Sequence, residues 1–266
     1  MPAPSWLFDR PIAHRGLHGL NPGCPENSLA AFEAAIARGY AIECDIQGAA
    51  DGTPMVFHDR ALDRMTGIDG AIDTLDAPAL QALRMAGTRQ TIPTLDAALA
   101  VVDGRVPLLI EIKPDARCVP LTETVAQRLA RYPGPAALQS FDIGALRWLR
   151  RHAPTIPRGL LTGTFAGQNL PLRRRLFLQS AAALPLIRPH YLGVELAHAG
   201  AAAIRVRRRA GLAVITWGIF GPADFRTARA ISDNQIFEGF LPDARRAPRA
   251  PRRRRPHGDR VGLSRL

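Results

Sequence analysis

The sequence of 266 residues contains almost no lysine, few cysteines and no long apolar run. Lys113 is its single lysine, so nearly all of its 35 basic residues are arginines. The three cysteines are odd in number and widely spaced, which argues against a disulfide framework or a cysteine-rich metal site and favours a reducing cytoplasm. No run reaches membrane-spanning length and no basic and apolar leader is evident, so we expect neither export nor a transmembrane segment.

The excess of positive charge is concentrated near the C-terminus. The formal net charge is +12, and residues 244–266 contribute +8 of it, with nine arginines against one aspartate. That segment contains proline and shows no apolar periodicity, so we expect a disordered basic tail after a domain formed by residues 1–243. Because the rest of the chain is only mildly basic, no specific nucleic-acid partner is expected. Recruitment to RNA through the tail is the alternative.

Eight short apolar runs alternate with segments of helical periodicity. The runs are residues 11–14, 41–46, 106–113, 136–141, 157–161, 191–196, 213–219 and 234–240. The helical segments include residues 27–39, 119–132, 143–152 and 222–230, the first with Asn27 as a possible N-cap and Gly39 as its end. This alternation predicts an α/β fold, a TIM (β/α)8 barrel. Residues 48–87 interrupt it with a hairpin at Asp51 and Gly52, which predicts a small insertion after the second strand.

Three carboxylates lie near the carboxyl ends of two predicted strands. Glu43 and Asp45 point to the same face of one strand, opposite Cys44, and Glu111 ends another. Active sites of such barrels lie at the carboxyl ends of the strands, so the three should meet at one mouth. Crowded acids raise one another's pKa unless a cation neutralises them. An all-oxygen donor set favours Mg²⁺ or Ca²⁺ over zinc.

Histidines and cations surround the predicted carboxylate cluster. His14 closes the first strand and His58 closes the hairpin, and imidazoles are suited to moving protons near neutral pH. The planar fork of Arg15 suits a phosphate, and the isolated use of lysine at Lys113 indicates a need for a compact ammonium group. Together with a hard cation, these groups suit attack on a phosphodiester.

A series of motifs appears in order along the chain: AHRG, PENSLAAFEAAIARG, IECDIQGAADGTPMVFHDRALDRMTG, IPTLDAAL and LLIEIKP. With these motifs the sequence resembles the glycerophosphodiester phosphodiesterase family. The resemblance implies a TIM barrel and metal-dependent hydrolysis of glycerophosphodiesters to an alcohol and sn-glycerol 3-phosphate. The residue roles that it implies are acid/base catalysis by His14 and His58, metal ligation by Glu43, Asp45 and Glu111, and phosphate binding by Arg15 and Lys113.

The resemblance is looser in the second half of the chain. Where family members often have a Trp-Thr-Val-Asn pattern and a later Thr-Asp, this chain has ITWGIF and IFEGFLPD. We expect Trp217 to line the substrate pocket and Glu238 to stand in for the aspartate. The remaining histidines, His18 among them, are assigned by default to the surface or the core.

Three alternatives stay open. One is phospholipase-D-like hydrolysis of lysophospholipids, and another is a binding protein without catalysis. Within residues 171–191, Arg173 to Arg175 beside apolar residues fit an outer barrel helix or peripheral contact with an anionic membrane. The sequence does not decide the head group, the choice between Mg²⁺ and Ca²⁺, or the oligomeric state.

Overall fold

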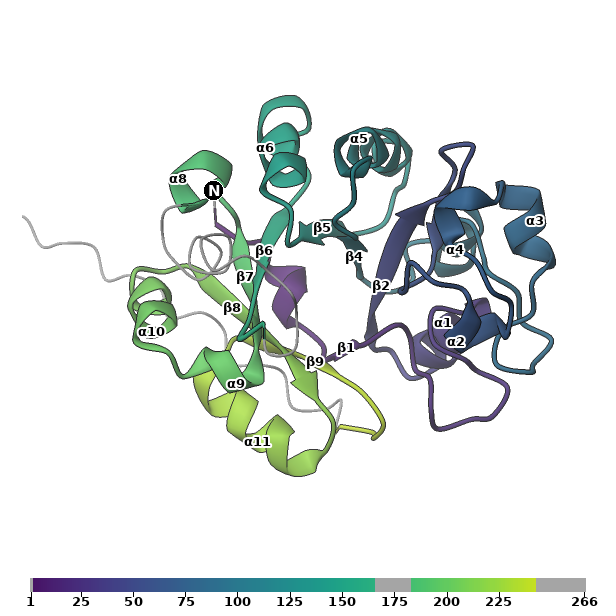
Figure 1. Cartoon of the computed structure of the whole chain (residues 1–266). Helices are drawn as coiled ribbons and strands as arrows, with labels where there is room; N and C mark the ends of the chain where they lie inside the picture. Colours follow the sequence, from purple (N-terminus) through teal and green to yellow (C-terminus); the bar gives the residue numbers. More distant parts are fainter. Residues whose placement is uncertain (1, 166–182, 243–266) are drawn as a thin grey trace, which may run out of the picture.

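The computed structural model describes residues 2–165 and 183–242, and its centre is a closed barrel of eight parallel strands (Figure 1). Strand β1 pairs with both β2 and β9, which closes the sheet. The barrel strands are β1 (Ile12–Ala13), β2 (Ala41–Gly48), β4 (Leu108–Ile112), β5 (Ala136–Ser140), β6 (Arg158–Thr162), β7 (Tyr191–Glu195), β8 (Ala213–Ile219) and β9 (Asn234–Phe237). The predicted TIM barrel is therefore confirmed.

Helices surround the barrel on its outer face (Figure 1). The longer ones are α1 (Leu29–Ala37), α4 (Leu95–Val102), α5 (Cys118–Leu129), α6 (Ile143–His152), α10 (Ala202–Arg209) and α11 (Pro222–Ile231). Shorter elements are η1 (Ser5–Phe8), α8 (Leu184–Ile187) and α9 (Leu196–Ala199). Side chains of Thr94 and Asp142 accept hydrogen bonds from the first turns of α4 and α6, which is the usual way to satisfy free amides there.

The predicted N-cap of α1 was wrong by one residue. The Ser28 side chain, not that of Asn27, accepts the hydrogen bond from the Ala31 amide. Asn27 has a left-handed backbone with φ of 57°, and its side-chain amide donates to Asp45 over 2.9 Å. The asparagine is thus turned away from the helix and toward the barrel. Gly39 follows the helix with φ of 68°, as expected of a terminating glycine.

The predicted insertion lies between β2 and α4. It starts with an antiparallel hairpin between β2 and β3 (Pro54–Val56), in the register Ile46 opposite Val56. Three short elements follow: α2 (Asp63–Thr66), η2 (Ile72–Thr74) and α3 (Ala77–Ala82). The insertion has an apolar core of its own, formed by buried residues that include Met55, Phe57, Leu62, Met65, Ile72 and Leu80. This core fixes the loop that carries His58 and Asp59.

Strand alternation divides the buried residues into two layers. Ile42, Cys44, Ile110 and Ile112 face outward and pack in the main core beneath the helices. Residues of opposite parity face the barrel interior, where an apolar cluster includes Ile12, Ala41, Leu109, Ala137, Tyr191, Ala213 and Ile215, together with Leu7 and Phe8 of η1. Farther along the same strands, this inward face becomes charged at Glu43, Asp45 and Glu111. The barrel interior is therefore apolar at its amino end and ionic at its carboxyl end.

Two features predicted from the sequence fall wholly or largely outside the described residues. They are the basic tail at residues 244–266 and the membrane-contact segment with Arg173 to Arg175. Within residues 2–165 and 183–242, no helix combines the length and apolarity needed to cross a bilayer.

Candidate active site at the mouth of the barrel

The three predicted metal ligands meet at the carboxyl end of the barrel. Asp45 on β2 stands directly opposite Glu111 on the adjacent β4, and Glu43 is two residues earlier on the same face of β2. One carboxylate oxygen from each lies within 4.8 Å of the others. All three residues are buried, with at most 8% of any of them exposed. Such a group of buried acids needs positive charge close by.

Lys113 and Arg15 supply part of that charge. The Lys113 ammonium lies 2.8 Å from Asp45 Oδ1 and 2.9 Å from Glu111 Oε1, and Arg15 Nε lies 3.3 Å from Asp45 Oδ2. Lys113 therefore joins the two neighbouring strands. Because its amide also donates to Ile46 O across the β2–β4 pair, the lysine is held at the end of the sheet.

The three carboxylates do not share one electrostatic state. Burial and the nearby Asp45 raise the pKa of Glu43 to about 7, and burial also raises the pKa of Glu111 against the attraction of Lys113. Burial would raise the pKa of Asp45 as well, but Lys113, His58 and Arg15 hold it below its usual range. We expected crowded acids to raise one another's pKa unless a cation neutralises them, and Asp45 is the acid beside which Lys113 and Arg15 supply that cation. The Lys113 ammonium and the Arg15 guanidinium lie closer to Asp45 than to Glu43.

A sharp turn after β1 positions His14 and Arg15. Arg15 has a left-handed backbone with φ of 54°, and Gly16 follows with φ of 79°. A Cβ atom on Gly16 would lie 2.8 Å from the Phe32 side chain and 2.9 Å from Ala31, so only glycine fits against α1. The turn directs the Arg15 amide to Glu43 Oε2, at 3.1 Å. The sequence His-Arg-Gly thus presents an imidazole and a guanidinium on the same rim.

Each of the two predicted catalytic histidines contacts a carboxylate through Nδ1. His14 Nδ1 lies 2.6 Å from Glu238 Oε2, and His58 Nδ1 lies 2.6 Å from Asp59 Oδ1. Burial would lower the pKa of His14, but Glu238 and Glu43 raise it above the ordinary value. Burial lowers the pKa of His58, and Lys113 and Arg15 add to the effect against the attraction of Asp45. In both cases Nε2 is the ring nitrogen left for the cavity side.

A network of ion pairs supports the His58 loop. Arg64 on α2 forms an ion pair with Asp59, and its guanidinium also contacts both oxygens of Glu26, at 2.6 and 3.0 Å. Glu26 in turn binds Arg15 at 2.8 Å. The Gln47 side chain donates to the carbonyl of His58 over 2.7 Å. The insertion is therefore connected to the His-Arg-Gly turn through one continuous set of charges.

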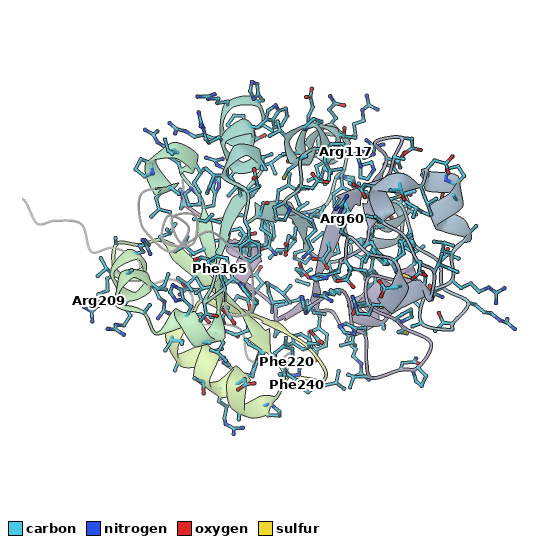
Figure 2. All side chains as sticks on the ribbon, in the orientation of Figure 1. Arg60, Arg117, Phe165, Arg209, Phe220 and Phe240 are labelled. Carbon is cyan, nitrogen blue, oxygen red and sulfur yellow. The ribbon has the colours of Figure 1, made fainter. Side chains whose placement is uncertain are left out.

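These charged groups border a cavity of about 460 Å³. Its polar wall includes both histidines, Arg15, Glu43, Glu111 and Lys113, whereas Phe141, Leu161, Phe165, Trp217 and Ile236 form an apolar wall. Trp217 lines the cavity, where the sequence led us to expect it. Arg60 and Phe165 both line the cavity and lie on opposite sides of the barrel centre in the view of Figure 2. The cavity could hold a small ester with one charged and one apolar part.

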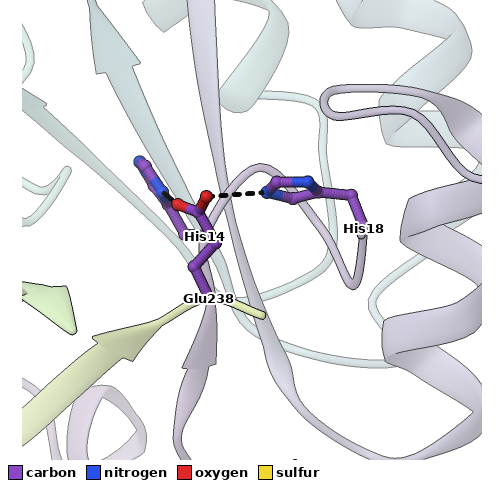
Figure 3. A group of neighbouring side chains, drawn as sticks. All are labelled: His14, His18 and Glu238. Atoms are coloured by element: carbon purple, nitrogen blue, oxygen red, sulfur yellow. Dashed lines mark hydrogen bonds and ion pairs between the residues drawn. The ribbon is translucent and has the colours of Figure 1, made fainter. Parts of the chain in front are cut away.

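Sequence reasoning missed several residues around this cavity. Asn27 and Asp59 lie inside recognisable motifs, PEN and HD, so their positions gave a usable signal. His18 was assigned to the surface or core by default, yet its Nε2 lies 3.9 Å from Glu238 Oε1 (Figure 3). No local pattern links His18 to a residue 220 positions later. Only closure of the barrel brings them together.

Comparison with known proteins gives a consistent picture. Residues 14–236 match the model of the Glycerophosphoryl diester phosphodiesterase family. A glycerophosphodiester phosphodiesterase of Caldanaerobacter subterraneus is 33% identical over 163 residues, which cover 56% of this chain and 65% of that protein. One of Bacillus altitudinis is 30% identical over 163 residues, covering 57% and 65%. The chain thus spans less than two thirds of the length of these curated relatives.

Two solved structures share the fold. One is an Oleispira antarctica phosphodiesterase in complex with the product sn-glycerol-3-phosphate, with a TM-score of 0.74 and 23% identity over 87% of this chain and 93% of that one. The other is a Thermotoga maritima glycerophosphodiester phosphodiesterase, with a TM-score of 0.66 and 24% identity over 85% and 92%. At such identities the likeness concerns the fold alone. The family match, in contrast, extends over most of the sequence, and the chain belongs to the glycerophosphoryl diester phosphodiesterase family.

Proposed function

We propose that this protein hydrolyses glycerophosphodiesters to an alcohol and sn-glycerol 3-phosphate, with the help of a divalent metal ion and two histidines. The observation that carries the proposal is the convergence of His14, His58 and the buried carboxylates on one cavity. Membership of the family and the product bound to the Oleispira antarctica protein support it. The cavity is small and has one charged wall and one apolar wall, which suits a compact phosphodiester.

Glu43, Asp45 and Glu111 are the residues that would hold the metal ion. Their donor set is all oxygen, one oxygen from each lies within 4.8 Å of the others, and burial raises the pKa of Glu43 and of Glu111. These properties fit Mg²⁺ or Ca²⁺. When bound, the ion would supply Lewis-acid polarisation of the phosphoryl group.

The protein's own residues would bind the phosphate and move the protons. Arg15 and Lys113 present donors at the rim, where they can attract the nonbridging oxygens and stabilise negative charge as it develops. In the reaction a new P–O bond forms to an attacking oxygen and the P–O bond to the alcohol breaks. If water attacks, sn-glycerol 3-phosphate results directly. If the substrate's glycerol hydroxyl attacks, a cyclic phosphate results, and water must then add to phosphorus and break one ring P–O bond to give sn-glycerol 3-phosphate. One histidine would accept the proton of the attacking oxygen and the other would donate a proton to the departing alcohol.

Glycerophosphocholine is the substrate that tests this proposal. We expect release of choline and sn-glycerol 3-phosphate by the full chain with Mg²⁺ or Ca²⁺, and loss of turnover in EDTA that either added ion restores. Glu111→Gln should lower activity by at least a hundredfold, because it removes one charged ligand. Glu33→Gln is the control, since Glu33 on α1 is 54% exposed and pairs with Arg105. Unchanged turnover in EDTA would refute the role of the metal ion.

The apolar wall of the cavity favours a second candidate substrate class. Phe141 contacts Phe165 and Trp217 edge to face, with its ring centroid 5.8 Å from that of Phe165 and 6.2 Å from that of Trp217. Such a wall can contact an acyl chain, as phospholipase-D-like hydrolysis of lysophospholipids would require. Turnover of lysophosphatidylcholine should therefore be compared with that of glycerophosphocholine under the same conditions. A binding protein without catalysis would bind both substrates and hydrolyse neither.

A further inference from the structure

A second group of possible metal ligands lies beside the carboxylate cluster and has different chemistry. Glu238, just after β9, lies between His14 and His18 (Figure 3). One donor atom from each of the three residues lies within 4.8 Å of the others. His14 Nδ1 contacts Glu238 Oε2 at 2.6 Å, and His18 Nε2 lies 3.9 Å from Glu238 Oε1. Two nitrogens and a carboxylate thus converge from distant parts of the chain.

The state of His18 is an independent indication that this group can bind a ligand. Its Nε2 atom is buried, has no hydrogen-bond partner among residues 2–165 and 183–242, and is directed at Glu238. A distance of 3.9 Å is too long for a hydrogen bond, and a buried polar atom without a partner is unfavourable. Two ligand atoms each about 2.1 Å from a common Zn²⁺ lie roughly 3 to 4 Å apart, so the observed gap matches a shared ion.

We propose that His14, His18 and Glu238 form a site for a borderline divalent transition ion, of which Zn²⁺ is the example, separate from the hard-cation site of the three acids. Imidazole nitrogens suit zinc and its neighbours, whereas carboxylate oxygens alone suit Mg²⁺ and Ca²⁺. Three protein ligands leave a fourth position for water.

The nearby positive charge of Arg15 does not prevent binding of a cation. Arg15 lies between Glu26, at 2.8 Å, and Asp45, at 3.3 Å, so two carboxylates offset its guanidinium. Glu238 contributes one negative charge of its own, and its side chain is 28% exposed, which leaves a route for the ion. His14 and Glu238 must separate slightly from their 2.6 Å contact to admit it.

Occupation of this site would have a consequence for His14. Ligation through Nδ1 would replace its contact with Glu238 and make Nε2, the ring nitrogen on the cavity side, a weaker base. Zn²⁺ should therefore slow turnover even when Mg²⁺ fills the carboxylate cluster. This consequence rests on the proposed function, whereas the binding itself does not. Binding and turnover are for that reason measured separately.

Equilibrium dialysis of the full, tag-free chain with Zn²⁺, in a large excess of Mg²⁺, tests the site. The wild type should bind one Zn²⁺ per chain under these conditions, and Co²⁺ in its place should give a visible d–d absorption band. His18→Ala should weaken binding by at least tenfold and abolish the band. His152→Ala is the matched control, because His152 is an exposed histidine on the outer helix α6.

Two results would overturn the proposal. One is that the wild type retains no Zn²⁺ in the presence of excess Mg²⁺. The other is unchanged Zn²⁺ affinity in both His18→Ala and Glu238→Gln, each shown to be folded by circular dichroism. The second variant guards against a misfolded first one, because Gln has nearly the shape of Glu and lacks its charge. Loss of Zn²⁺ binding in a folded variant supports the site, whether or not that variant is catalytically active.

Discussion

His14 and Glu238 form one histidine–carboxylate pair at the active site, and His58 and Asp59 form the other. The contact distance is the same in both pairs, but the groups that surround them differ. In both pairs Nδ1 lies 2.6 Å from a carboxylate oxygen. Asp59 is the next residue after His58 and forms an ion pair with the permanent cation Arg64. Glu238 is 224 residues away from His14, and its second oxygen faces His18. One pair is local and held by arginine, and the other depends on the closed barrel.

This difference teaches that a local contact alone does not set the behaviour of a histidine. Both imidazoles are largely enclosed, and burial alone would lower both pKa values. The pKa of His14 is nevertheless raised, because Glu238 and Glu43 lie close to it, whereas Lys113 and Arg15 help to lower that of His58. Charged neighbours from other segments of the chain therefore decide the direction in which the pKa of each histidine shifts.

The largest expected effect comes from removing either imidazole. His14→Ala and His58→Ala should each lower kcat/KM for glycerophosphocholine by about 10²- to 10⁴-fold, because each removes a proton-transfer group. A p-nitrophenyl phosphodiester, whose leaving group needs no proton, should then distinguish the two. We expect it to rescue one variant and not the other, which identifies the proton donor. Equal rescue of both, measured by steady-state kinetics, would contradict a division of roles.

The carboxylate partners should have a smaller effect than the imidazoles. Glu238→Gln and Asp59→Asn should each lower kcat by on the order of 10- to 100-fold with little change in KM, as for other carboxylates that orient an imidazole. Asp59→Asn should also lower stability, because it leaves Arg64 without one partner. Asp96→Asn, which alters an exposed ion pair with Arg128, is the control for both. A change confined to KM would argue against positioning of the histidines.

The parts of the molecule that could be predicted from sequence follow from local or periodic rules. Alternation of side chains along β2 placed Glu43 and Asp45 inside the barrel and Cys44 outside. Helical periodicity gave residues 143–152, the observed bounds of α6, and the Asp51–Gly52 turn gave the hairpin. In each case the controlling residues lie within a few positions of one another.

The parts that could not be predicted depend on contacts between distant segments. Asn27 sits one residue before the true cap, and only the folded barrel shows that it binds Asp45. The lowered pKa of Asp45 needs Lys113 and Arg15 in place, which are far from it in sequence. The contacts of Glu238 require β9 to lie beside β1, as it does in the closed sheet. Tertiary structure supplies these neighbours.

The smallest expected effect concerns the far end of the network that holds the His58 pair. Glu26 is 13% exposed and binds both Arg15 and Arg64. Burial would raise its pKa, but the hydrogen bonds and attraction of these arginines lower it. An acid with a lowered folded pKa stabilises the fold above its ordinary pKa of 4.5, and the contribution disappears as pH falls through the folded value.

Glu26→Gln should therefore lower the free energy of unfolding by about 1 kcal/mol at neutral pH, a modest value because Arg64 is partly exposed. The difference between wild type and variant should shrink as the pH is lowered below 4.5, because the wild-type carboxylate becomes protonated as well. Urea unfolding at several pH values measures it, with Glu33→Gln, exposed on α1, as the control. A difference that stays constant down to strongly acidic pH would mean that Glu26 acts through packing, and the charged link between the insertion and the His-Arg-Gly turn would then contribute nothing measurable to stability.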